Sequence, residues 1–360
     1  MKSTLLAGTR KGLIAYKHHP DGWKIENISF EGVPVSIAYA DPRNGRWWAC
    51  LDHGHWGVKL QYSDDRGHTW QETTAPAYPE GEEIKDGVPA TARYLWAVSQ
   101  GGRAFPNRIW IGTEPGGLFV SENGGENFEL VESLWRHPSR KEQWFGGGRD
   151  HPGIHSVVVD PRDENRLWIG ISCAGVFEST DSGKTWQVRN NGLRADFFPD
   201  PTSEIGHDPH SLVAAPSNPD VLWQQNHCGI FVSKNGGKDW QDVSQKEGPA
   251  NFGFAIAVAD DNPDQAWVAP AQSDFIRVAI DKALCISRTD DGGQTWRDFR
   301  KGLPQENCFD IVYRHALVSS GDGVAFGTTT GNLFFSDDRG ERWQAISNYL
   351  PMVHSLQFAD

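Results

Sequence analysis

The sequence predicts an all-β chain that folds as a single seven-bladed β-propeller domain over residues 1–360. The first observation behind this prediction is an eight-residue pattern, Ser/Thr-x-Asp/Asn-x-Gly-x-x-Trp/Phe, which occurs in six good copies. The second is the spacing of the copies, because a period of roughly 50 residues is typical of propeller blades. The third is the composition, in which short apolar runs alternate with Gly, Pro, Asn and Asp and therefore indicate strands and turns.

The repeated pattern has a physical logic as a folding unit. Its Asp or Asn can accept backbone N–H bonds in a tight turn, its Gly can take a positive φ, and its aromatic ring can be buried between neighbouring sheets. The six copies end at Trp70, Phe128, Trp186, Trp240, Trp296 and Trp343, and a degenerate seventh ends at Trp23. We therefore expect these turns to be structural and remote from function.

Each full repeat is predicted to contain four strands, called A to D, with the repeated turn joining C to D. In the third copy these strands correspond to residues 155–160, 166–171, 175–180 and 185–190. The chain begins with a B-like segment, residues 3–9, and ends with an A-like segment, residues 353–359. The last strand should therefore complete the first blade, which closes the ring and removes exposed sheet edges.

Several short segments resemble a known family. They are GTRKGL (8–13), DHGHWG (52–57), GTEPGGLF (112–119), DHPGIHS (150–156), QNHCGIF (225–231) and FGTTTGNLF (326–334). With the repeated turn, they make the chain similar to the Asp-box (BNR) repeat propellers, which include sialidases, sortilin-type domains and photosystem assembly factors. The resemblance is strongest to a bacterial group of sialidase-like, or "glycosyl hydrolase"-like, repeat proteins. It covers nearly the whole chain and implies the propeller fold with Asp boxes, but no particular reaction.

Strand direction assigns the loops to two faces. Since neighbouring strands of a blade run antiparallel, the D–A and B–C loops share one face with the starts of the A strands. Eight of the 13 histidines fall on that face: His53, His55, His151, His155, His207, His210, His227 and His354. The long connections 136–153 and 190–207 lie there too, and long loops of a compact domain are usually functional or disordered. We expect this face to carry the site.

The dipeptide His-Ser occurs at the start of three A strands, at His155, His210 and His354. We expect these imidazoles to converge at the mouth of the central channel, with His53, His227 and Asp310 within reach, Asp310 being placed at the start of another A strand. Imidazole and carboxylate ligands suit a divalent metal such as Zn, Mn, Fe or Ni. In the competing interpretation, these polar groups only bond the backbone of neighbouring strands.

Other polar residues are placed on the same face. The candidate catalytic residues are His155, His210, Glu114 and Arg10, since imidazole and carboxyl groups can move protons. The candidate substrate-binding residues are Arg149, Asp150, His151, His55 and Asn226. Asp208, between His207 and His210, is a further candidate at the rim.

Composition narrows the partners and the compartment. The net charge of −13 and a pI near 5.4 argue against nucleic-acid and membrane binding, which favour a basic surface. The N-terminus has no long apolar segment typical of a signal peptide. Five cysteines at irregular spacing indicate reduced thiols, so we expect a cytoplasmic protein.

Two classes of function remain. The first is an enzyme, a hydrolase or a lyase, that acts on a small polar, carbohydrate or anionic ligand at the histidine-rich mouth. True sialidase activity is disfavoured within this class, because the resemblance implies an arginine triad and an N-terminal Arg-Ile-Pro element, and neither is recognisable in this chain. The second is a non-catalytic binding or assembly propeller.

Overall fold

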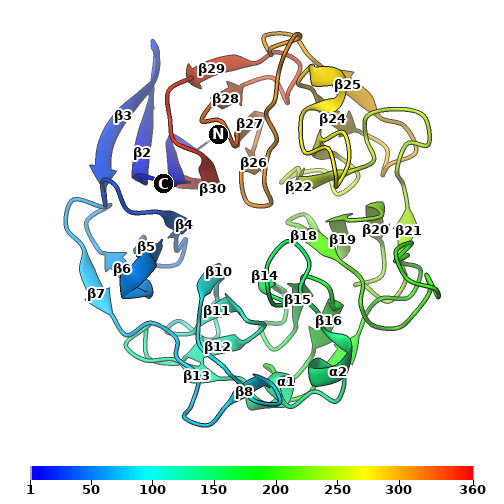
Figure 1. Cartoon of the computed structure of the whole chain (residues 1–360). Helices are drawn as coiled ribbons and strands as arrows, with labels where there is room; N and C mark the ends of the chain where they lie inside the picture. The colour runs from blue at the N-terminus through cyan, green and yellow to red at the C-terminus, as the bar shows by residue number, and fades with distance from the viewer. Residues whose placement is uncertain (1, 360) are drawn as a thin grey trace.

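The computed structural model describes residues 2–359 and confirms the predicted fold. Seven four-stranded antiparallel sheets stand around a central axis as the blades of one ring (Figure 1). Each sheet runs from an inner strand near the axis to an outer strand at the rim, and consecutive strands pair throughout. The largest fully buried side chains include seven tryptophans, so aromatic packing between and within the blades forms much of the core.

The strands follow one another blade by blade around the ring. The first three blades consist of β30 (Val353–Ala359), β1 (Thr4–Thr9), β2 (Gly12–His19) and β3 (Gly22–Ser29); β4 (Val35–Ala40), β5 (Trp47–Asp52), β6 (Val58–Ser63) and β7 (Gln71–Thr73); and β10 (Tyr94–Gln100), β11 (Ile109–Glu114), β12 (Leu118–Ser121) and β13 (Glu129–Leu130). The fourth and fifth consist of β14 (Ile154–Val159), β15 (Leu167–Ile171), β16 (Gly175–Ser179) and β17 (Gln187–Val188); and β18 (Pro209–Ala215), β19 (Asn218–Asn226), β20 (Gly229–Ser233) and β21 (Gln241–Asp242). The last two consist of β22 (Gly253–Val258), β23 (Ala266–Pro270), β24 (Ile286–Thr289) and β25 (Arg297–Phe299); and β26 (Leu317–Ser320), β27 (Gly323–Gly327), β28 (Leu333–Ser336) and β29 (Gln344–Ser347).

The remaining elements lie in the connections. They are the hairpin of β8 (Glu83–Lys85) and β9 (Val88–Pro89), the short helices α1 (Glu132–Trp135) and α2 (Arg140–Gln143), and two 3₁₀ turns, Gly54–Trp56 and Ile280–Lys282. None of the helices within residues 2–359 has the length and apolarity needed to cross a membrane. All five cysteines are free thiols, as expected, while the cytoplasmic location stays a prediction.

The C-terminal strand closes the ring as predicted. Strand β30 pairs antiparallel with β1, from Thr4 opposite Ala359 to Gly8 opposite Ser355. The two ends of the chain therefore share one blade, and Figure 1 shows them side by side. Closure gives β1 partners on both sides, so β1 is not left as an exposed edge strand.

The repeated turns have the predicted geometry. In the third copy, Ser179 Oγ accepts the amide of Gly183 at 2.8 Å, and Asp181 Oδ1 accepts the amide of Thr185 at 2.9 Å. Gly183 has a φ of 82°, which a side chain would resist. The indole of Trp186 then reaches back to Ser133 Oγ of the preceding blade at 3.1 Å. This turn thus shapes its own blade and contacts the connection that follows the preceding blade.

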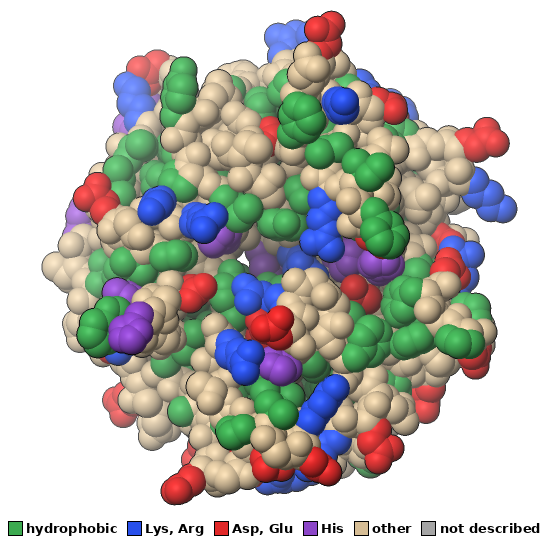
Figure 2. All heavy atoms as spheres, viewed as in Figure 1, with side chains coloured by type: hydrophobic (Ala, Val, Ile, Leu, Met, Phe, Trp, Pro, Cys, Tyr) green, Lys and Arg blue, Asp and Glu red, His purple; other side chains and the backbone are tan. Residues whose placement is uncertain are grey.

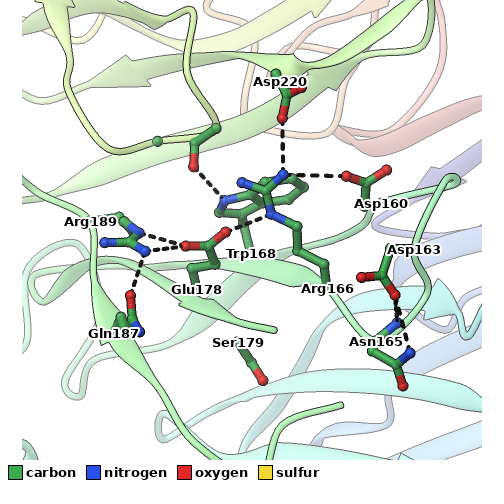
Figure 3. Close-up of polar contacts among 12 residues, drawn as sticks. Asp160, Asp163, Asn165, Arg166, Trp168, Glu178, Ser179, Gln187, Arg189 and Asp220 are labelled. Carbon is green, nitrogen blue, oxygen red and sulfur yellow. Dashed lines mark hydrogen bonds and ion pairs between the residues drawn. The ribbon is translucent and has the colours of Figure 1, made fainter. Parts of the chain in front are cut away.

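A charged network joins two blades on the face that carries these turns (Figure 3). Arg166 donates to Glu178 at 2.6 Å within its own blade and to Asp220 of the next blade at 2.9 Å. Its guanidinium lies 4.3 Å from the ring centroid of Trp168, and Glu178 also accepts from Arg189. Every charged group in this network has an opposite partner, which makes it a structural contact between blades.

The inner strands share an irregularity that matters for the site. In five of them one extra residue interrupts the pairing register: Ser36 in β4, Trp96 in β10, His155 in β14, His210 in β18 and His354 in β30. Strand β22 shows a related shift, between Gly253 and Ile256. A β-bulge redirects the side chain of the extra residue. The same β-bulge therefore redirects a side chain near the start of five inner strands.

Candidate functional site

A cavity opens at the centre of the ring, on the face that carries the D–A and B–C loops. Its volume is about 670 Å³, within the range of small-molecule sites. Figure 2 shows a hollow near the centre of the molecule, bordered by histidine and by Lys or Arg side chains. The irregular inner strands supply much of the wall, through Ser36, Trp96, His210, Phe254 and His354. The position of the cavity agrees with the face chosen from the sequence.

Arg314 lies deep in this cavity. It comes from the segment just before β26 and also lines a second cavity, of about 380 Å³, further down the channel. Its guanidinium carbon lies 4.9 Å from the ring centroid of Trp96 and 5.8 Å from that of Phe254. Its buried Nε has no hydrogen-bond partner, and no ion pair joins it to a carboxylate of residues 2–359. Arg314 is therefore a cation at the channel centre that makes no direct ion pair, although the charge of Asp208 lies near enough to stabilise it.

Beside Arg314, one carboxylate and two imidazoles converge. Asp208 Oδ2 lies 3.3 Å from His210 Nε2 and 3.7 Å from His227 Nδ1. Asp208 Oδ1 is fixed by the hydroxyl of Ser172 and the amide of Cys173, both at 3.1 Å. Strand β18 supplies His210, the segment before it supplies Asp208, and the β19–β20 turn supplies His227.

The outer nitrogen of each imidazole in this cluster also has a partner. His210 Nδ1 lies 2.7 Å from the carbonyl oxygen of Gly253, and His227 Nε2 lies 3.5 Å from Asp274 Oδ2. His210 is further enclosed by Phe254, whose ring stacks on it at 4.7 Å. Each imidazole is thus oriented from behind, which directs its other nitrogen toward Asp208.

Burial and neighbouring charges shift the pKa values of this cluster. Burial raises the pKa of Asp208, but the fields of His210 and Arg314 outweigh it and hold that pKa well below its usual range. Burial lowers the pKa of His210, and Asp208 offsets this only in part. The pKa of the nearby His315 falls to about 4, through burial first and Arg314 second.

One wall of the cavity is a paired arginine. Arg149 Nη1 donates to Glu114 Oε2 at 2.7 Å, and its guanidinium carbon lies 3.8 Å from the ring centroid of Tyr94. Glu114 is buried, so this pair fixes the direction of Arg149. Both residues were predicted for the site: Arg149 lines the cavity, whereas Glu114 does not line it and pairs with Arg149 instead. Burial raises the pKa of Tyr94 to about 12, which keeps its phenol protonated near neutral pH.

The three predicted His-Ser histidines do not converge. His210 and His354 line the upper cavity, but His155 lines the second one. His155 is fully buried, its Nδ1 contacts Ser156 Oγ at 2.9 Å, and its ring packs against Trp96. The bulky Trp96 ring and the fully buried position of His155 keep it away from the upper cavity. Of the three, only His210 belongs to the cluster with Asp208 and His227.

Two of the three serines of these dipeptides have the structural role considered in the competing interpretation. Ser156 Oγ accepts a hydrogen bond from the amide of Leu212, and Ser355 Oγ accepts one from the amide of Ala38, each over 3.1 Å. In both cases the donor lies in the inner strand of the next blade. His354 Nδ1 likewise contacts the carbonyl oxygen of Val35 at 3.2 Å. The repetition of the dipeptide therefore reflects contacts between blades more than a shared site.

Two further predicted site residues lie outside the lining of both cavities. Asp310 does not start an A strand, since β26 begins at Leu317; instead it accepts bonds from Thr330 Oγ1 and Asn332, away from the cavity lining. Asn226 is fully buried and accepts the amide of Cys228 at 3.0 Å within the β19–β20 turn. Both side chains are occupied by local bonds.

The remaining candidates lie on the rim and line neither cavity. They are Arg10 and His55, which are exposed, His53 and His151, which are half-buried, and Asp150, which is exposed and lies 3.7 Å from Arg93. His53 is not part of the Asp208 cluster. None of these positions contacts the groups at the channel centre.

Sequence reasoning missed the most unusual residue of the site, Arg314, and left Asp208 at the rim. The aromatic walls, Trp96 and Phe254, were also overlooked. A usable signal existed, because each of these residues lies near the start of a predicted inner strand, as His210 does. Searching that position in every blade, for any residue type, would have found Trp96 and Phe254 as well as the histidines.

Fold and repeats together define the class: the chain is an Asp-box-repeat β-propeller, and residues 61–72 match the family described as BNR/Asp-box repeat. Among relatives, an oligoxyloglucan-reducing end-specific xyloglucanase from Emericella nidulans is 26% identical over 220 residues, covering 53% of this chain and 25% of the relative. The xyloglucanase Xgh74A of Acetivibrio thermocellus is 24% identical over 291 residues, covering 73% of this chain and 33% of the relative. The chain thus spans a quarter to a third of the length of these relatives.

Two solved structures share the fold. An ancestral GH74 enzyme superposes with a TM-score of 0.60 at 19% identity, covering 87% of this chain and 38% of that one. YCF48 from Cyanidioschyzon merolae superposes with a TM-score of 0.58 at 16% identity, covering 92% of this chain and 95% of that one. At these identities the likeness establishes the propeller architecture alone.

Proposed function

We propose that this propeller is a carbohydrate-acting enzyme that binds a small anionic saccharide in the upper cavity. The observation that carries the proposal is Arg314, a cation at the channel centre that makes no ion pair with any carboxylate of residues 2–359 and whose Nε has no hydrogen-bond partner. A buried charge without a partner is costly, so an anionic ligand that pairs with Arg314 would recover that cost. The chain as a whole carries a net charge of −13, so the positive charge of Arg314 is a local feature of the cavity and does not reflect a basic protein.

The cavity walls suit a sugar acid. Aromatic rings from Trp96, Phe252, Phe254 and Tyr313 supply apolar surface, and the Arg149–Glu114 pair supplies an oriented donor at one side. A planar guanidinium can hold a carboxylate through two parallel hydrogen bonds. The fit is therefore to a ring with one acidic substituent, such as a uronic acid.

A hydrolase is the first choice of reaction class, because several relatives are named as xyloglucanases. Bond cleavage needs a group that gives or takes a proton near the substrate. Asp208 with His210 and His227 provides such groups beside Arg314. A lyase would use the same groups, with Arg314 stabilising charge that develops on the substrate's carboxylate as the adjacent proton leaves.

The test is a binding and turnover screen with matched acidic and neutral oligosaccharides. Wild-type protein should bind glucuronate- or galacturonate-containing oligosaccharides and should discriminate against neutral xyloglucan oligosaccharides. Arg314→Met should weaken binding about 10- to 100-fold, since hydrogen bonds to a charged group are worth about 1.5–3 kcal/mol. New reducing ends without ultraviolet absorption would indicate hydrolysis, whereas an absorbing unsaturated product would indicate elimination.

A matched control is His68→Ala, an exposed histidine in a repeated turn of the opposite face, which should bind as wild type does. Equal binding of acidic and neutral oligosaccharides, or unchanged binding by Arg314→Met, would contradict the proposal.

A second candidate is a non-catalytic binding propeller. Exposed apolar side chains on the loops of the channel-mouth face favour it: Trp56, Phe197, Phe275, Ile276, Phe309 and Tyr349. A further structure with this fold is described as YCF48 bound to D1 peptide, at a TM-score of 0.55 and 13% identity. If a peptide partner uses this face in the present protein, Tyr349→Ser should weaken its binding and leave saccharide binding unchanged, because Tyr349 is 95% exposed and does not line the cavity.

A further inference from the structure

We propose that Asp208, His210 and His227 hold a divalent transition-metal ion in the upper cavity. The three residues each offer a ligand atom, and these atoms lie within 4.8 Å of one another. The proposal concerns the free protein and does not depend on the saccharide proposed above.

The distances suit a small ion. Asp208 Oδ2 lies 3.3 Å from His210 Nε2 and 3.7 Å from His227 Nδ1. Ligand atoms on a tetrahedral zinc ion lie about 3.3–3.5 Å apart, as follows from bond lengths of about 2.0–2.2 Å. Only a small adjustment would therefore bring the three atoms into coordination, and the cavity leaves room for a further ligand.

The hydrogen bonds behind the imidazoles are those of metal ligands. A ligating histidine almost always donates its other N–H to a carbonyl or carboxylate, which fixes the ring and its tautomer. His210 Nδ1 faces the carbonyl oxygen of Gly253 at 2.7 Å. His227 Nε2 faces Asp274 Oδ2 at 3.5 Å. In both rings the nitrogen left over faces the same oxygen, Asp208 Oδ2.

A metal ion would account for the convergence of His210 and His227 on one carboxylate oxygen, Asp208 Oδ2. A carbonyl oxygen only accepts, so His210 Nδ1 carries a proton toward Gly253 and its Nε2 is the nitrogen placed to coordinate. The negative charge of Asp208 also offsets the neighbouring positive charge of Arg314.

The donor set identifies the class of metal. Two imidazoles and one carboxylate suit Zn²⁺, Fe²⁺ or Mn²⁺, while Ca²⁺ and Mg²⁺ prefer oxygen ligands. A bound ion with an open position would supply a Lewis acid that can polarise a substrate oxygen or activate water. With the ion bound, that water would take over the proton-transfer role assigned above to the free side chains of Asp208, His210 and His227. Of the metal ligands expected from the sequence, the proposed site keeps His210 and His227. It adds Asp208 and omits the others.

The test uses untagged full-length protein stripped with a chelator and titrated calorimetrically with Zn²⁺, without any saccharide. Wild type should bind one equivalent, and Co²⁺ should give a visible d–d spectrum that reports nitrogen and oxygen ligands. His227→Ala should lose the site, or weaken it at least 100-fold. Asp274→Asn, which keeps all three ligands, should weaken Zn²⁺ binding by about 10- to 100-fold.

His68→Ala is the matched control and should bind Zn²⁺ as wild type does. His227 is only half-buried, so its variant should stay folded, and Asp274→Asn tests the site again if it does not. Failure of the wild type to take up Zn²⁺, or equal binding by His227→Ala and His68→Ala, would overturn the proposal. Either result would leave the saccharide proposal standing, because that one is tested at Arg314.

Discussion

Two arginines of this propeller have opposite surroundings. Arg166, on the Asp-box face, donates to Glu178 and Asp220 and stacks on Trp168 (Figure 3). Arg314, at the channel centre, has aromatic neighbours and no ion pair with any carboxylate of residues 2–359. The guanidinium of Arg166 joins two blades, whereas that of Arg314 makes no ion pair and could pair with an anionic ligand. The difference distinguishes the Asp-box face, where charged groups stabilise contacts between blades, from the channel-mouth face, where a charged group is available to a ligand.

The largest effect on stability is expected at Arg166, whose guanidinium has carboxylate partners in two blades. Arg166→Met should lower the free energy of unfolding by about 1–3 kcal/mol, because it leaves Glu178 and Asp220 with fewer partners. Arg189 still pairs with Glu178, which limits the loss. Urea denaturation measures the change, and saccharide binding by the folded variant should equal that of wild type. An unchanged denaturation midpoint would show that this network does not stabilise the ring.

A smaller effect is expected in a repeated turn. Asp181→Ala removes bonds to the amides of Lys184 and Thr185 and should cost about 1 kcal/mol. The pKa of Asp181 is lowered in the fold: burial raises it, but hydrogen bonds from Thr185 and Ser179 outweigh burial. A lowered folded pKa stabilises the protein above the unfolded pKa, and this stabilisation is lost as the pH falls through the folded value.

The stability of the Asp181→Ala variant should therefore depend less on pH than that of wild type under acidic conditions. Thermal melting at a series of acidic pH values measures this. Equal acid sensitivity in the two proteins would contradict the role assigned to the turn, as would a selective binding defect in folded Asp181→Ala.

The smallest effect on stability is expected at Arg314. Arg314→Met removes a charge that makes no direct ion pair, so the free energy of unfolding should stay within about 0.5 kcal/mol of wild type or rise. The same urea denaturation used for Arg166→Met gives the comparison. If Arg314→Met loses as much stability as Arg166→Met, then Arg314 is structural and the contrast between the two faces fails.

Much of the fold was predictable because it depends on local chemistry repeated along the chain. The turn residues at Ser179, Asp181 and Gly183 make bonds within a few positions of one another, so their spacing carries the information. The closing strand was predictable for a related reason, since residues 353–359 have the pattern of an inner strand that the first blade lacks. The face with long loops and histidines followed from strand direction alone.

The membership of the site was less predictable. His155 and His210 occupy equivalent sequence positions and both lie at bulges, yet one lines the lower cavity and the other the upper. The surroundings decide this: Trp96 packs on His155, while Phe254 stacks on His210. These neighbours come from different blades, and no spacing within the chain encodes them.

The sequence by itself determined the number of blades, the closure of the ring and the face of the molecule on which polar groups gather. Each follows from hydrogen bonding and apolar periodicity over short stretches. Only the tertiary structure decided that Asp208, His210 and His227 meet, and that Arg314 lies near the rings of Trp96 and Phe254 without a direct ion pair. Side chains from separate blades reach these positions through the curvature of the whole ring. Their contacts depend on packing across the channel, which the order of residues does not reveal.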